Sequence, residues 1–146
     1  MQLTGSHILA APIEKVWQML MDTDILAKIV PGVSRLEKTG ENQFEAISEI
    51  KLGPVSGKFS GGLTLSDILE PSTFTLNVSQ NSKIGNADAS IKINLVALDA
   101  QQTEISFDGD AKLSGLLART GQRVLSGVAN TLTKQFFSNF EEEIAS

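Results

Sequence analysis

The chain of 146 residues contains no cysteine and only one histidine, His7. The lack of cysteine excludes disulfides, thiolate nucleophiles and cysteine metal sites together. A metal site would have to be built almost entirely from carboxylates, and the acidic run Glu141–Glu143 is more typical of a solvated helix end than of a ligand cluster. We therefore predict no metal, no cofactor and no catalytic residue.

Long apolar runs and clustered positive charge are also missing. No apolar stretch reaches the roughly 20 residues that span a bilayer, and the N-terminus lacks the basic and apolar regions of a signal peptide. The 12 basic residues are scattered and the net charge is −5, which argues against a nucleic-acid partner. These features predict a soluble, cytoplasmic protein, and the length suits one domain over residues 1–146.

The last third of the chain carries apolar residues at helical spacing. They are Leu113, Leu117, Gly121, Val124, Val128, Leu132, Phe136, Phe140 and Ile144. The spacing predicts a single long helix over about residues 114–144, with this face buried. Gly115, Gly121 and Gly127 interrupt it, and each costs roughly 1 kcal/mol against alanine in a helix interior. Such glycines either admit another backbone or leave space, and here we expect mainly space.

The N-terminal third combines one strand with two short helices. Alternating residues from Gln2 to Ala10 predict a strand that places His7 on its inward side. Pro12 then opens a helix, because proline suits the first helical position. A second short helix is capped by Asp22 or Thr23 and ends at Pro31 and Gly32.

From Val33 to Lys112 the apolar period changes to two. Turn residues interrupt it at Gly40–Asn42, Gly53–Pro54, Glu70–Ser72, Asn81–Asn86 and Asp99–Gln102. These breaks predict about six strands in an antiparallel meander. With the first strand, the fold class is α+β: a curved sheet of about seven strands, apolar on one side and covered by the C-terminal helix.

Many positions on the inward side of the sheet are small. They include Gly5, Ala46, Ser48, Gly57, Gly61, Ala87, Ala89, Gly109 and Ala111. A filled core would use larger side chains, so we predict an internal apolar cavity. The alternative is that the glycines only permit strong curvature of the sheet. The residues expected to contact a ligand are His7, Ala46, Ser48, Ile50, Phe59, Gly61, Leu76, Ala89, Ile91, Phe107, Leu117, Gly121, Val124 and Val128.

Four stretches resemble the CoxG family, the G-subunit family of carbon monoxide dehydrogenase. They are Ala11–Trp17, Val30–Val33, Leu52–Phe59 and Gln135–Phe137. The order of elements is similar to the helix-grip fold of START lipid-transfer domains and birch-pollen-allergen-like proteins. The resemblance implies a non-catalytic accessory protein that holds a quinone or lipid and serves a carbon monoxide dehydrogenase or related molybdenum hydroxylase. Some relatives continue into a C-terminal membrane anchor, whereas this sequence ends at Ser146, so we expect at most peripheral membrane contact.

Two classes of function stay open at this point. The first is a binding module for an apolar molecule. The second is a small cyclase- or hydrolase-like enzyme on the same fold, with His7 as the working group. An enzyme requires several convergent polar groups, and no inward carboxylate that could orient His7 is identifiable from the sequence. The binding module is therefore favoured.

Overall fold

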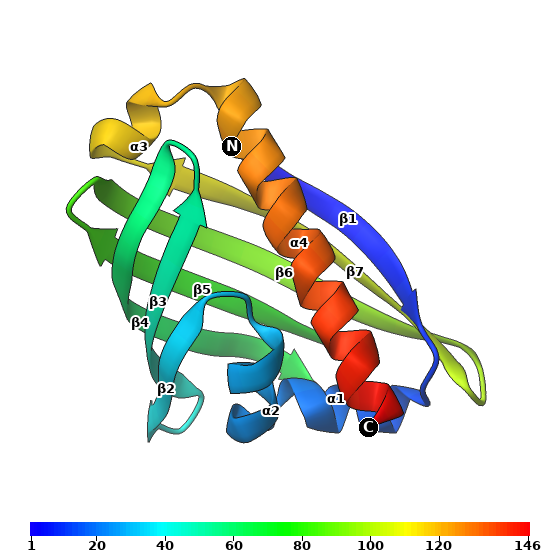
Figure 1. Ribbon diagram of the computed structural model, residues 1–146. Coiled ribbons are helices and arrows are strands. Elements are labelled where there is room, and N and C mark those ends of the chain that lie inside the picture. Colours follow the sequence, from blue (N-terminus) through cyan, green and yellow to red (C-terminus); the bar gives the residue numbers. More distant parts are fainter.

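The computed structural model describes all residues from Met1 to Ser146 and contains one antiparallel sheet and four helices. In chain order the elements are β1 (Gln2–Leu9), α1 (Ile13–Leu20), α2 (Thr23–Ile29), β2 (Val33–Gly40), β3 (Gln43–Leu52), β4 (Val55–Leu69), β5 (Thr73–Ser82), β6 (Gly85–Asp99), β7 (Gln102–Leu113), α3 (Gly115–Arg119) and α4 (Gln122–Ala145). The curved sheet wraps around α4, while α1 and α2 lie at the end that holds the C-terminus (Figure 1). The predicted α+β helix-grip architecture is confirmed.

The seven strands follow the order β1-β7-β6-β5-β4-β3-β2, so the predicted meander from β2 to β7 is confirmed. Short turns join its strands, as at Gly53, whose φ of +59° suits a residue without a side chain. β1 pairs with β7, from Gln2 opposite Asp110 to Leu9 opposite Thr103. β1 and β2 are therefore the two edges of the sheet, and α1 and α2 connect them.

The two short helices begin where the sequence predicts. Pro12 is the N-cap of α1, and the carboxylate of Asp22 caps α2 by accepting from the backbone N–H groups of Asp24 and Ile25, at 2.9 and 3.3 Å. One face of α1 is buried and includes Val16 and Trp17. These caps and apolar faces fix α1 and α2 against the rest of the core.

The predicted long C-terminal helix is confirmed as α4, but its predicted start at about residue 114 is wrong, because the chain breaks between α3 and α4. Gly121 is the N-cap of α4 and has a φ of +101°, which no helical residue adopts. The predicted face holds in the second half of α4, where Phe140 is fully buried. Near the break it does not, because Leu125 is buried whereas Val124 is 41% exposed. None of the four helices is both long and apolar enough to cross a membrane.

The core consists of two clusters at opposite ends of the sheet. The larger cluster includes Val16, Trp17 and Phe140 at the α1 end, and the smaller one comprises Val55, Phe59, Leu117 and Leu125 under α3. Between them the inner side of the sheet is only half-buried. The accessible surface is 8224 Å², whereas a compact monomer of 15.6 kDa exposes about 7,200 Å². The excess of about 1,000 Å² fits a sheet whose inner side is only partly covered.

Candidate ligand-binding site

An apolar cavity of about 300 Å³ lies beneath α2, between strands β2 to β6 and α4. It is lined by Leu20, Leu26, Val30, Pro31, Val33, Leu36, Phe44, Ala46, Ser48, Leu63, Leu65, Phe74, Leu76, Val78, Gln80, Ile93 and Phe136. Of these 17 residues 14 are hydrophobic, and none carries a charge. Such a lining suits an apolar ligand that is oriented by few polar contacts.

Strand register brings the sheet side of this cavity together. Phe44 lies opposite Leu63, and Leu63 lies opposite Val78, so alternate residues of β3, β4 and β5 form one continuous apolar surface. The only polar side chains on it belong to Ser48 and Gln80. They can supply one or two hydrogen bonds to a polar end of a ligand.

The helices close the other side of the apolar cavity. Leu26 of α2 and Phe136 of α4 both line it. Asn139 holds the two helices together, since its side-chain amide donates to the carbonyl of Ile29 at 3.2 Å. Lys28 and Glu143 add an ion pair between α2 and α4 at 3.7 Å. The position of α2 therefore decides how far the cavity is covered.

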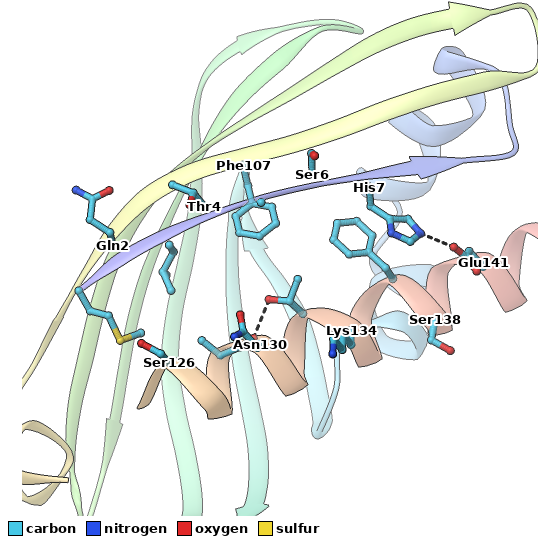
Figure 2. Close-up of a pocket in the computed structure, with 16 residues that line it drawn as sticks. Gln2, Thr4, Ser6, His7, Phe107, Ser126, Asn130, Lys134, Ser138 and Glu141 are labelled. Carbon is cyan, nitrogen blue, oxygen red and sulfur yellow. Dashed lines mark hydrogen bonds and ion pairs between the residues drawn. The ribbon is translucent and has the colours of Figure 1, made fainter. Parts of the chain in front are cut away.

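A second hollow, the polar groove, runs between β1 and α4 and has a volume of about 520 Å³ (Figure 2). It is lined by Met1, Gln2, Leu3, Thr4, Gly5, Ser6, His7, Phe107, Ser126, Ala129, Asn130, Thr133, Lys134, Phe137, Ser138 and Glu141. Only five of these 16 residues are hydrophobic. The polar groove therefore suits a different kind of partner from the apolar cavity.

His7 closes one end of the polar groove. Its Nε2 shares a hydrogen bond with a carboxylate oxygen of Glu141, and its ring stacks on Phe137 with centroids 4.6 Å apart (Figure 2). The expectation that no carboxylate orients His7 is therefore wrong. This pairing could not be predicted from the sequence, because Glu141 lies 134 positions from His7, in an acidic run that is typical of a solvated helix end. No cluster of three or more potential metal ligands is present.

Residues 5–145 match the family model described as the G subunit of carbon monoxide dehydrogenase (CoxG). The chain belongs to this family. A conserved protein from Geobacillus kaustophilus, 33% identical, superposes with a TM-score of 0.96, covering 99% of this chain and 95% of that one. The resemblance of the sequence to the CoxG family is thus confirmed. A comparison with curated proteins finds no match.

More distant structures share the fold of this CoxG-family chain. A START superfamily protein from Mycobacterium smegmatis is 13% identical, with a TM-score of 0.78 and coverage of 99% of this chain and 97% of that one. The Zhui aromatase/cyclase from Streptomyces sp. R1128 is 15% identical, with a TM-score of 0.72 and coverage of 98% and 92%. At these identities the likeness shows the START-like fold alone.

The structure distributes the predicted ligand contacts over several places. Ala46, Ser48 and Leu76 line the apolar cavity, and His7 and Phe107 line the polar groove. Four other predicted contacts lie beneath α3. Phe59 and Leu117 belong to the small core cluster there, and Ile50 and Val128 pack against it. The neighbouring half-buried positions Gly61, Ala89 and Ile91 lie on the strands but outside the cavity lining, and Gly121 and Val124 are exposed.

Of the 17 residues that line the apolar cavity, the sequence interpretation named only Ala46, Ser48 and Leu76 as ligand contacts. It missed the other positions on β3–β6 and α4, and the whole part of the cavity between α1 and β2. Leu20, Leu26, Val30, Pro31, Val33 and Leu36 all line it. A signal is present in the sequence, because Leu26 lies on the apolar face of α2 and the apolar Val30 directly follows the helix. Such a face usually indicates ordinary core packing, whereas here α2 lies over a hollow part of the sheet.

Several inward glycines serve close contact rather than empty space. A Cβ on Gly61 would lie 2.0 Å from the carbonyl oxygen of Ser79, and one on Gly109 would lie 2.5 Å from that of Ser90. A Cβ on Gly5 would meet the ring of Phe107 at 2.6 Å. At these positions the alternative explanation, that glycine lets neighbouring groups approach in a curved sheet, is correct.

Proposed function

We propose that this CoxG-family chain is a non-catalytic carrier that holds an apolar molecule, a quinone or a lipid, in the apolar cavity. The observation that carries the proposal is the lining, with 14 hydrophobic residues of 17 and no charged group. Without titratable groups the cavity offers no general acid or base, so it suits binding rather than chemistry. Ser48 and Gln80 are the candidates for contact with a carbonyl or hydroxyl of the ligand.

The energetic cost of an empty cavity supports the same proposal. The scaling from closed cavities in core truncations, about 24 cal/mol per Å³, sets an upper bound of about 7 kcal/mol on the cost of leaving this 300 Å³ cavity empty, because it is partly open to solvent. This is comparable to the whole stability of a typical domain, about 5–15 kcal/mol. An apolar occupant would recover part of that cost, so we expect the protein to retain a ligand through purification.

The family description also suggests whom the carrier serves. CoxG-family membership supports an accessory role beside a carbon monoxide dehydrogenase or a related molybdenum hydroxylase. A quinone in the apolar cavity would fit such a role, because it could accept the electrons that an oxidation releases.

Mass spectrometry of an organic extract of the purified protein would identify the occupant. A protein that yields no apolar compound, and binds neither a short-chain quinone nor a fatty acid, would contradict the carrier proposal.

The cavity is tested directly by filling it. We expect Ala46→Leu to lower the affinity for a short-chain quinone or a fatty acid by at least about tenfold, because the new side chain occupies the volume that the ligand needs. The free energy of unfolding of the ligand-free Ala46→Leu variant should not fall below that of the wild type, whereas overpacking a full core would lower it by about 1–3 kcal/mol. Ala89→Leu is the matched control, since Ala89 is half-buried on β6 but outside the cavity lining. Equal losses of affinity in both variants would argue against this cavity as the site.

A second candidate is a cyclase- or hydrolase-like activity centred on His7. One observation favours it, since Glu141 pairs with the imidazole as the orienting group of a general base would. However, His7 and Glu141 line the polar groove and not the apolar cavity. An enzyme would therefore bind its substrate in the polar groove, and this separation allows the two functions to be tested independently.

A further inference from the structure

The polar groove follows the free edge of β1. It is lined by every residue from Met1 to His7, including residues whose side chains point to opposite faces of the sheet. Consecutive residues of a strand can all line one groove only when the groove runs along the backbone edge rather than over one face. The backbone of β1 is therefore one wall of this groove, and α4 is the other.

The register of β1 shows which backbone groups face the groove. Met1 and Ala111 exchange two hydrogen bonds of 2.8 Å each, so this position is a hydrogen-bonded pair. Pairs alternate along an antiparallel ladder. Gln2, Thr4 and Ser6 therefore point their N–H and C=O groups away from β7, toward the groove. These groups are arranged as a template for another strand.

The two edges of the sheet differ in how well they are protected. β2 carries Arg35, Glu37 and Lys38, and its pairing with β3 is shifted at two places. Charges and irregularities of this kind discourage further strands from pairing with an edge. β1 has no charged residue, no proline and no register shift over Gln2–Leu9. Only the β1 edge is left open for pairing.

The α4 wall offers polar groups that are also free. Asn130 and Lys134 line the groove beside β1 (Figure 2). Glu141 is already paired with His7, whereas Lys134 forms no ion pair. Lys134 is thus the charged side chain of the groove that has no partner of opposite charge. A second copy of this chain would not neutralise it through β1, because Gln2–Leu9 contains no acidic residue.

We propose that the β1 edge is a docking site for an extended peptide segment of a partner protein, which adds as an eighth strand and places an acidic side chain near Lys134. Main-chain hydrogen bonds to Gln2, Thr4 and Ser6 would provide the common part of the affinity, and the contact with Lys134 would provide selectivity. The site is separate from the apolar cavity and does not depend on the ligand held there.

The test uses the full chain and an acetylated, amidated octapeptide of alternating threonine and valine with one central glutamate. We expect amide hydrogen exchange of Thr4 and Ser6, fast in the free protein, to slow on addition of peptide, while that of Gly5 and His7 is slow throughout. No new protection at millimolar peptide would overturn the proposal. Protection of Thr4 and Ser6 without peptide, accompanied by a dimer in solution, would overturn it in favour of self-pairing.

Matched variants separate strand addition from loose adsorption. Ser6→Pro removes an N–H that faces the groove but spares the pairing of Gly5 and His7 with β7, and it should weaken peptide binding by at least about tenfold. Ser6→Ala keeps the N–H and should bind like the wild type. Lys134→Gln should weaken binding of the glutamate peptide by about threefold. It should not change the binding of a control peptide in which glutamine replaces the glutamate. Equal binding by Ser6→Pro and Ser6→Ala would overturn the proposal.

Discussion

The apolar cavity and the polar groove lie on two flanks of the same helix and have opposite linings. Phe136 lines the apolar cavity, and the next residue, Phe137, lines the polar groove, with ring centroids 5.2 Å apart. The cavity has no charged group, whereas the groove holds His7, Lys134 and Glu141. Two neighbouring residues of one helix thus line an apolar site and a polar site, respectively. The fold can therefore hold a ligand and meet a partner at independent places.

The largest expected effect comes from the core that supports both sites. Phe140 is fully buried and packs edge-on against Phe136 at 5.9 Å. We expect Phe140→Ala to lower the free energy of unfolding by about 3–5 kcal/mol, because it removes buried surface and leaves a void. Val124→Ala, at a position 41% exposed, is the control and should change it by less than about 0.5 kcal/mol. Denaturant titrations of both variants would check this, and equal effects would contradict the observed burial.

The next largest effect is expected at Gly121, at the start of α4, the helix that lines both sites. Gly121 has φ +101° and ψ 140°, a conformation that costs other residues about 1–3 kcal/mol. Gly121→Ala should therefore destabilise the fold by that amount. Gly127 lies inside α4, and a Cβ there would meet nothing within 4 Å. Gly127→Ala should stabilise the fold by up to about 1 kcal/mol. Thermal melts would show opposite shifts, and equal shifts would mean that α3 and α4 form one continuous helix.

Gly121 also shows why part of the structure could not be predicted from the sequence. The spacing of apolar residues from Leu113 to Ile144 fits one helix, and nothing local distinguishes a helical glycine from one with positive φ. Whether the chain breaks depends on α3, which packs on the β5–β6 turn: the N–H of Leu117 donates to the carbonyl of Ile84 at 2.9 Å. With the break in place, Leu125 rather than Val124 is buried in the first turn of α4.

The strands were more predictable than the cavity, for a related reason. Strand parity is a local property with period two, so the inward placement of Phe44, Ala46 and Leu76 could be predicted directly. Which inward residues remain uncovered depends on where α2 and α4 lie over the sheet. Ala46 and Ala89 look alike in the sequence, yet only Ala46 lines the apolar cavity. The location of a cavity is a property of packing rather than of pattern.

The smallest expected effect isolates the polar groove. His7→Phe keeps an aromatic ring to stack on Phe137 but removes the hydrogen bond with Glu141. The pair is partly exposed, so a double-mutant cycle with Glu141→Gln should give a coupling of about 0.2–1 kcal/mol. Affinity for a quinone or fatty acid in the apolar cavity should change by less than about tenfold, or 1.4 kcal/mol, because His7 does not line it.

The enzyme alternative predicts a different result. If the wild type hydrolysed or cyclised a test substrate, and both His7→Phe and Glu141→Gln abolished this activity, the pair would be catalytic and the polar groove would be an active site. Unchanged ligand affinity in both variants would leave the apolar cavity as the carrier site and restrict the His7–Glu141 pair to holding β1 against α4.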